Sequence, residues 1–158
     1  MNGNQPQSPL PESAFAFNGS YVRSVDVKGR FNLPFKFLRG GSGPEEEKFV
    51  VARGADDSLS LMPHSVWMAN FNRLRQEGAP GPKLRNYLRK MSSQSQTVEP
   101  DGQGRVAVSS EMLKAIGIDK KIEIVGMGEH MELWDPDALV KANAVTDDES
   151  EYDNQFFR

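Results

Sequence analysis

The chain of 158 residues contains no cysteine and no long apolar run. The absence of cysteine excludes disulfide bonds, thiolate catalysis and zinc sites with cysteine ligands. No segment reaches the ~18 consecutive apolar residues that indicate a membrane-spanning helix. Residues 1–13 are polar and contain prolines, without the basic start and apolar stretch of a signal peptide. These absences predict a soluble, cytoplasmic protein that makes no membrane contact.

The usual signatures of catalysis and of metal or nucleotide binding are also missing. His64 and His130 are the only histidines, and there is no HExxH, phosphate-loop or G-x-S-x-G pattern. Residues 129–132 with Asp135 are a weak metal candidate, because no second histidine lies one helical turn away. Residues 126–128 match only part of a dinucleotide fingerprint. We therefore predict no enzyme activity, cofactor, metal or small-molecule substrate.

A turn pattern, Asp-x-x-Gly-Arg, is present twice. The first copy covers residues 26–30 and the second covers residues 101–105. An alternating segment follows each arginine directly, which is typical of a turn that leads into a half-buried strand. The chain therefore contains two copies of one unit, with an arginine at the mouth of each turn.

The duplication continues after the two turns. Each copy predicts a turn, a strand, a short helix, two further strands and a helix. Pro63 and Pro136 are each expected to open the last helix of their copy, where a missing backbone donor does no harm. The two later strands of each copy are expected at 49–52 and 58–63, and at 122–125 and 131–136.

These repeats divide the chain into five segments. A unit of about 60 residues buries too little surface for comfortable stability, so the two repeats are expected to share one core. Helices are predicted over 63–77 and 83–91, and residues 40–47 are predicted to form an exposed loop. The segments are a disordered N-terminal extension (1–14), the first repeat (15–67), a helical connector (68–96), the second repeat (97–144) and an acidic tail (145–158).

Charge is distributed unevenly around a net value of −3. Residues 23–39 hold five basic groups and one acidic group, and residues 73–90 hold six against one. Such clusters are typical of a surface that faces a polyanion. The cluster at 73–90 is also typical of the solvated side of a helix. Five acidic residues lie within 147–153. This tail is either a solvated end or a segment that covers the basic surface and competes with a polyanion bound there.

Each residue of the repeated turn has an expected role. The aspartates are expected to accept backbone hydrogen bonds across the turn, and the glycines to adopt positive φ. The arginines are expected to project from this scaffold, where a guanidinium can bind guanine O6 and N7 together or clamp a phosphate. The alternative is an internal Asp–Arg salt bridge without DNA contact. The residues concerned are Asp26, Gly29 and Arg30, and Asp101, Gly104 and Arg105.

The two copies differ in the charge around the arginine. Lys28 and Arg23 lie close to Arg30 in the sequence, whereas Gln103 takes the place of Lys28 beside Arg105. We therefore expect the first copy to make the stronger DNA contact, with Arg105 and Gln103 as the weaker counterpart.

Several segments, taken in order, resemble the MraZ family. They are Phe17-Asn18-Gly19, Val25 to Arg30 with Leu33-Pro34, Leu59 to Pro63 with Trp67, Asp101 to Arg105, and Val125-Gly126 with Glu132-Leu133-Trp134. The resemblance covers about residues 15–142 and is therefore stronger than any single motif.

This resemblance implies a bacterial transcriptional regulator with two SpoVT/AbrB-like repeats. The implied fold is β-dominated α+β, a double-split, swapped-hairpin β-barrel with pseudo-two-fold symmetry. The family is associated with the division and cell-wall gene cluster, which implies a nucleoid-associated protein that binds G-rich direct repeats of double-stranded DNA as a ring-like homo-oligomer.

A second hypothesis is a protein-interaction module on the same fold. An antitoxin-like or adaptor protein would bind its partner through residues 73–90 or through the acidic tail. Large apolar side chains belong either to the interface of the ring or to the core. The residues concerned are Trp67, Phe71, Trp134 and Leu139.

Overall fold

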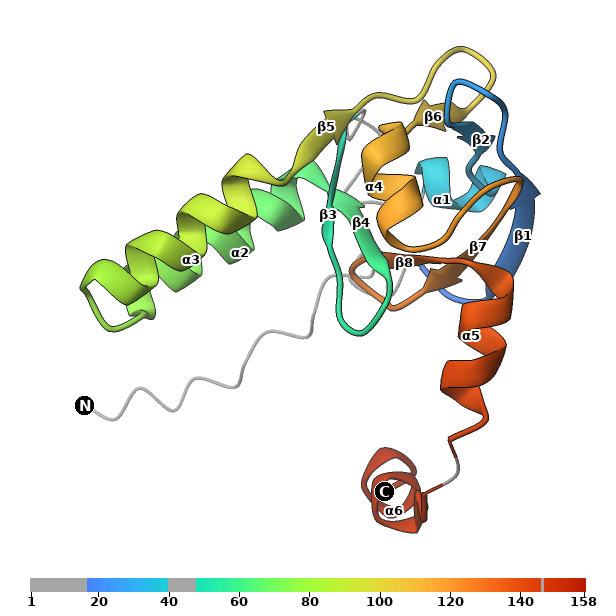
Figure 1. The fold of residues 1–158 in the computed structure, drawn as a ribbon. Coiled ribbons are helices and arrows are strands. Elements are labelled where there is room, and N and C mark those ends of the chain that lie inside the picture. The colour runs from blue at the N-terminus through green and yellow to red at the C-terminus, as the bar shows by residue number, and fades with distance from the viewer. Residues whose placement is uncertain (1–16, 40–47, 146) are drawn as a thin grey trace.

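A computed structural model describes residues 17–39, 48–145 and 147–158 of the chain (Figure 1). The predicted disordered extension (1–14) and the predicted loop (40–47) lie outside the described residues. In chain order, the elements are β1 (Ser20–Ser24), β2 (Arg30–Asn32), α1 (Phe35–Arg39), β3 (Phe49–Arg53), β4 (Leu59–Pro63), α2 (His64–Glu77), α3 (Pro82–Ser93), β5 (Gln96–Val98), β6 (Arg105–Ala107), α4 (Ser110–Ala115), β7 (Lys121–Gly126), β8 (Met131–Trp134), α5 (Pro136–Asn143) and α6 (Ser150–Phe156).

The strands of the two repeats are interleaved. One antiparallel sheet has six strands in the order β1-β7-β8-β4-β3-β5, and β2 pairs with β6 in a separate two-stranded ribbon. The pairs β1–β7, β4–β8 and β2–β6 each join a strand of the first repeat to one of the second. Neither repeat therefore completes its sheet alone, as expected for two units that share a core.

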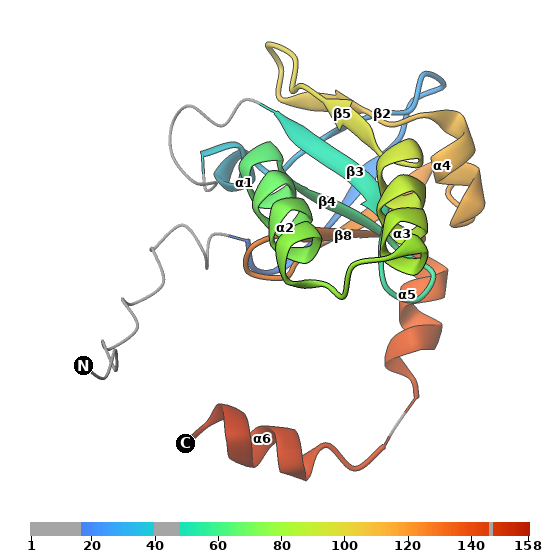
Figure 2. The ribbon, with the colours of Figure 1, turned by 90° about the vertical axis from the view of Figure 1, so that its left-hand side faces the viewer.

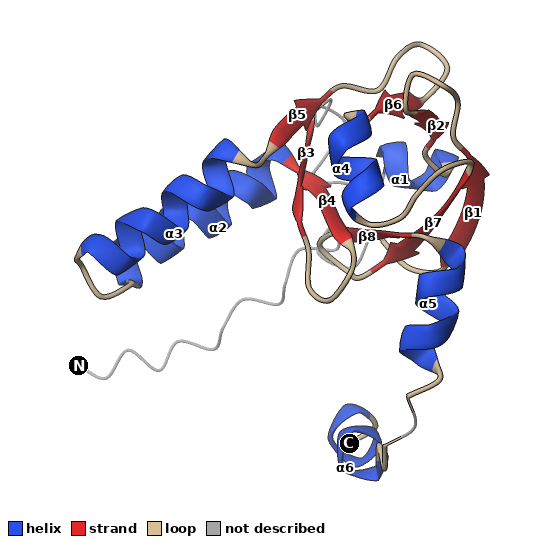
Figure 3. Ribbon diagram, in the orientation of Figure 1, coloured by secondary structure: helices blue, strands red, loops and turns tan. Residues whose placement is uncertain are grey.

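The fold is β-dominated with helices, as predicted, but no closed barrel is found. Among the described residues, β1 and β5 are the edges of an open sheet, and the β2–β6 ribbon forms no ladder with either edge. β2 and β6 are each three residues long, and these two strands form their ladder with one another. In Figure 3 the strands curve around α1 and α4 without closing a hydrogen-bonded ring.

The core is built from alternating strand residues of both repeats. In β7, Ile122 and Ile124 are fully buried, whereas Glu123 between them is half-buried. Phe31 of β2 lies opposite Val106 of β6, and both side chains are buried. Burying a side chain of this size stabilises the fold by roughly 1.5–3 kcal/mol. The shared core thus holds the two repeated turns in a fixed relation.

The structure adds two strands that the sequence analysis did not predict. β1 and β5 are rich in polar residues, and the predicted strands of the two repeats include neither of them. Each pairs with an apolar strand, β1 with β7 and β5 with β3, and this pairing makes them strands. Pro63 also differs from expectation: it ends β4 and occupies the position before α2, whereas Pro136 opens α5 as predicted.

Helices α2 and α3 form an arm that projects from the β-strands (Figure 1). Neither helix contains a fully buried residue. The acidic tail contains α6, which lies apart from the arm in Figure 1 and in Figure 2 and also has no buried residue. Within the described part of the chain, no helix is long and apolar enough to cross a membrane.

Candidate nucleic-acid interface

The first repeated turn is organised by one carboxylate. Asp26 Oδ1 accepts hydrogen bonds from the backbone N–H groups of Lys28 and Arg30, each at 2.9 Å. Asp26 Oδ2 accepts a third hydrogen bond, from Arg30 Nε at 2.7 Å. The backbone closes the turn from Gly29 N to Asp26 O (3.0 Å) and from Asp26 N to Arg30 O (3.0 Å). Asp26 therefore shapes the turn and orients its arginine.

The second turn has the same geometry. Asp101 Oδ1 accepts from the N–H groups of Gln103 and Arg105, each at 2.9 Å, and Oδ2 accepts from Arg105 Nε, also at 2.9 Å. The duplication seen in the sequence is thus a duplication of hydrogen bonds as well. The expected roles of both aspartates as acceptors are consistent with these contacts.

The glycines lie where the two turns meet the ribbon. Gly29 and Gly104 have φ of 76° and 77°, a region that side chains disfavour. Val108 N donates to Gly29 O (3.0 Å), and Leu33 N donates to Gly104 O (3.1 Å). A Cβ on Gly29 would overlap the Val108 carbonyl oxygen. A Cβ on Gly104 would lie 2.8 Å from the end of the Leu38 side chain.

The ribbon brings the two arginines to one face. Arg30 lies opposite Ala107, and Asn32 lies opposite Arg105. Directly opposed residues share a face, so these four point away from the core, to which Phe31 and Val106 belong. Arg30 and Arg105 are diagonal neighbours, a relation that separates residues by about 7–8 Å. The sequence analysis missed Asn32, because strand pairing alone places it beside Arg105.

Both arginines remain accessible to a ligand. The side chain of Arg30 is 35% exposed and that of Arg105 is 30% exposed. Among the described residues, each guanidinium uses only Nε for a side-chain hydrogen bond, which leaves its terminal Nη groups without a partner. The internal salt bridge and an outward-facing guanidinium are therefore compatible. The ion pair orients the guanidinium and leaves its Nη groups available for a ligand.

The other predicted DNA contacts have different surroundings. Lys28 and Gln103 are exposed at the two turn tips. Arg23 is half-buried on β1; its guanidinium lies 5.4 Å from the centre of the Tyr21 ring, and Nη1 donates to the Val22 carbonyl. In the described residues no hydrogen bond or ion pair joins Arg23 to either turn.

The remaining candidate residues have structural contacts. Trp134 is buried in the core, and its Nε1 donates to Glu132 Oε1 (3.1 Å). Asp135 caps α5 through the N–H of Ala138. The described residues contain no group of three or more acidic or histidine side chains arranged to hold a metal ion. Trp67, Phe71 and Leu139 are half-buried rather than core residues.

Hydrogen bonding also changes the acidity of the two turn aspartates. The backbone N–H and then the side chain of Arg30 lower the pKa of Asp26 below its ordinary value of 3.8. The backbone N–H of Arg105, followed by that of Gln103, lowers the pKa of Asp101 in the same way. Both carboxylates are therefore charged near neutral pH, as a partner of arginine must be.

Comparison with known proteins places this chain in a family. The family model described as "MraZ protein, putative antitoxin-like" matches residues 91–150. A protein of Mycoplasmoides gallisepticum named Transcriptional regulator MraZ is 32% identical over 132 residues, which are 84% of this chain and 90% of that protein. The chain belongs to the MraZ family.

Other MraZ proteins show the same extent of similarity. Proteins with the same name from Corynebacterium glutamicum and Mycobacterium ulcerans are each 30% identical, over 122 and 125 residues, and each match covers 77% of this chain and 82% of the relative. The resemblance noted in the sequence is thereby confirmed. These MraZ relatives are named as regulators rather than as enzymes.

We predict that the two turn glycines differ in their tolerance of alanine. Gly29→Ala adds positive-φ strain and an overlap with backbone, so it should destabilise the protein by at least about 1–3 kcal/mol. Gly104→Ala carries the same strain, but the flexible Leu38 side chain can move, so its cost should be smaller. Gly102→Ala is the control, because no heavy atom lies within 4 Å of its added Cβ. Urea unfolding of the three variants measures this order, and equal costs at Gly29 and Gly102 would contradict it.

The lowered pKa values predict a loss of stability in acid. Both aspartates have a lower pKa folded than unfolded, so their contribution is complete above about pH 5 and is lost as the pH falls through the folded pKa values. The double variant Asp26→Asn with Asp101→Asn should therefore lose less stability than the wild type between about pH 5 and pH 2. Urea midpoints across this range measure the effect, with Asp119→Asn, an exposed aspartate outside both turns, as the control. Identical acid profiles for wild type and double variant would refute it.

Proposed function

We propose that this protein is a DNA-binding transcriptional regulator that reads double-stranded DNA with the outer face of the β2–β6 ribbon. The observation that carries the proposal is the pair of outward-facing arginines, one from each repeat, held by aspartates on one face. Membership in a family whose relatives are named transcriptional regulators supports it.

The ribbon has a suitable size and chemistry for the major groove. B-DNA accepts a two-stranded ribbon there, and each guanine presents O6 and N7 to a guanidinium fork. The diagonal separation of about 7–8 Å between the arginines is close to two base steps of about 3.4 Å each. Two forks at this spacing favour sites rich in guanine, in agreement with the G-rich repeats implied by the sequence resemblance.

The two repeats contribute unequally in this proposal. Lys28 adds a cation at the tip of the first turn, whereas Gln103 occupies the second tip. Lysine attracts phosphate as a point charge, so Lys28 is assigned to the backbone next to the base that Arg30 reads. Arg105 and Gln103 then make the weaker contact. Arg23 contributes only to the positive electrostatic potential of the surface, because its guanidinium is engaged with Tyr21 and the backbone.

Repeated contacts supply the affinity that one ribbon lacks. A few phosphate contacts at physiological salt give a non-specific Kd of about 10⁻⁴–10⁻⁶ M. A ring of subunits on evenly spaced direct repeats makes the later contacts intramolecular, which raises avidity by roughly 10²–10⁴-fold. We therefore propose a ring-like homo-oligomer that acts, within the cytoplasm, on G-rich repeats upstream of the division and cell-wall genes.

An antitoxin-like or adaptor function is the second candidate. It is favoured by the projecting α2–α3 arm and by the wording of the matched family model. Salt dependence separates the two hypotheses. The affinity for DNA should fall linearly in a plot of log affinity against log salt concentration. An adaptor would neither bind duplex DNA nor prefer G-rich sequences.

The first test replaces Arg30. Arg30→Ala should weaken binding to upstream DNA by about 5- to 150-fold, which corresponds to the 1–3 kcal/mol of one bidentate base contact. Arg30→Lys should retain binding to DNA with scrambled G-rich boxes while losing the preference for the natural boxes, because lysine keeps the charge but not the fork. Gel shifts or fluorescence anisotropy measure both.

Arg73→Ala is the matched control for this test. Arg73 is an exposed arginine on α2 whose side chain donates to Asn70 Oδ1 (2.8 Å), so its loss should leave the base preference unchanged. Wild-type protein that binds natural and scrambled boxes equally would contradict the proposed function. Normal discrimination by Arg30→Ala would contradict the assignment of Arg30.

A further inference from the structure

A groove runs between the β3–β4 strands and the α2–α3 arm. Its outer part has a volume of about 150 Å³ and an apolar lining from both helices of the arm, including Phe71, Leu74 and Leu88. Its inner part has a volume of about 350 Å³ and reaches polar groups of the β-strands. Met62, Trp67, Tyr87 and Met91 line both parts, so we treat them as one arm groove.

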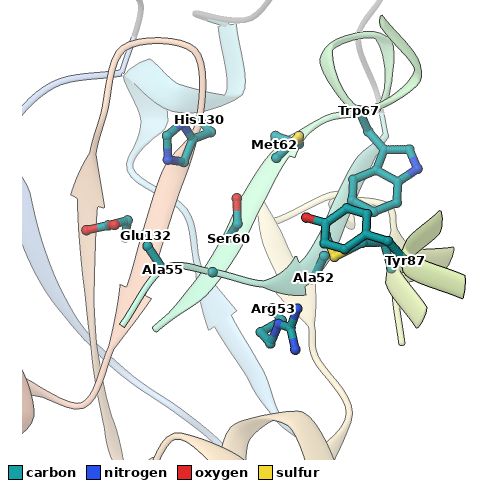
Figure 4. A pocket seen from close by; sticks show the side chains of 11 residues that line it. Ala52, Arg53, Ala55, Ser60, Met62, Trp67, Tyr87, His130 and Glu132 are labelled. Atoms are coloured by element: carbon teal, nitrogen blue, oxygen red, sulfur yellow. The ribbon is translucent and has the colours of Figure 1, made fainter. Parts of the chain in front are cut away.

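The inner part of the arm groove contains an unpaired buried group. Ser60 is 7% exposed, and its Oγ has no hydrogen-bond partner among the described residues. Figure 4 shows Ser60 near His130 and Glu132 on one side, with Trp67 and Tyr87 together on the other. A buried hydroxyl without a partner is costly, so this position favours an occupant that brings a polar atom.

The two helices that line the arm groove carry exposed lysines and arginines, which we call the basic rim. On α3, Leu84 and Leu88 are spaced one turn apart, and Arg85 and Arg89 follow them along the adjacent stripe. Residues 64–93 contain six lysines and arginines against one acidic residue, Glu77. The surface therefore suits an amphipathic helix with aromatic anchors and acidic flanks.

The α6 segment has this complementary pattern. Tyr152 and Phe156 are one helical turn apart, and Glu149 and Asp153 form the adjacent acidic stripe. Tyr152 is 70% exposed and Phe156 is 83% exposed. The neighbouring Phe157 ring packs edge-on against Phe156, with centroids 5.1 Å apart. Exposed aromatic side chains gathered on a short helix mark a binding surface.

We propose that α6 of a second copy of this chain docks in the arm groove. Aromatic side chains of α6 fill the apolar part, and its acidic stripe faces the basic rim. A cavity of about 150 Å³ accepts one benzene-sized ring, which is the anchor that Phe156 offers. The partner is a second copy because α6 and the arm of one chain lie apart in both views. This inference stands independently of DNA binding.

Charge exchange between the two surfaces tests the proposal. An arm-reversed protein carries Arg85→Glu and Arg89→Glu, and a tail-reversed protein carries Glu149→Arg and Asp153→Arg. Each alone should lose docking at least tenfold, because like charges then face one another. A mixture of the two should dock again, since the acidic arm of one meets the basic tail of the other. A single chain with all four changes should also dock, which excludes misfolding as the cause.

Cysteine cross-linking supplies the readout, since the natural chain has no cysteine. Ala55→Cys lies at the groove, and Asn154→Cys lies on α6. A short bismaleimide reagent should join an Ala55→Cys chain to a larger, tagged Asn154→Cys chain. Ala79→Cys, an exposed alanine at the tip of the arm, is the control and should cross-link much less.

Four outcomes would overturn the proposal. The first is cross-linking that ignores the charge reversals. The second is that a chain carrying both Ala55→Cys and Asn154→Cys cross-links internally, while two chains with one cysteine each do not cross-link. The third is an unchanged yield when Phe156→Ala and Phe157→Ala remove the anchors. The fourth is a charge-reversed arm that loses DNA affinity while tail docking is unaffected, which would assign the basic rim to nucleic acid.

Discussion

The bidentate use of one aspartate in each turn is the interaction on which the remaining structure of the site depends. Oδ1 gathers two backbone N–H groups, and Oδ2 holds Nε of the arginine that starts the ribbon strand. The same carboxylate thus sets the backbone path and the direction of the guanidinium. An exposed ion pair contributes little to stability. Its value here is orientation, because a fork that is already aimed loses less conformational entropy on binding.

Duplication turns this local device into a surface. A single turn would present one arginine on an unsupported three-residue strand. Pairing β2 with β6 gives each strand its hydrogen-bond partner and places Phe31 and Val106 in a common core. The same ladder puts Arg30 and Arg105 on the outer face. The two copies are no longer identical at their tips, where Lys28 and Gln103 differ, so the surface combines symmetric backbone with asymmetric charge.

The α2–α3 arm gives the molecule a second surface, which differs from the first in its chemical composition. The turns present fixed guanidinium groups, whereas the arm presents the half-buried Trp67 and the exposed Tyr87 beside lysines and arginines. The first suits a rigid polyanion, and the second suits an amphipathic helix. Separate surfaces allow association between copies and DNA contact to occur together, which the proposed avidity requires.

The sequence by itself determined the local features: the turn chemistry of Asp26 and Asp101, the positive-φ glycines and the order of the elements that follow each turn. These depend on residues within a few positions of one another. It did not reveal β1 and β5, whose polar residues become strands only beside β7 and β3, nor the open sheet. The approach of Arg30 and Arg105 was decided by tertiary structure alone. Their positions are 75 residues apart, and only the ladder between the repeats brings them together.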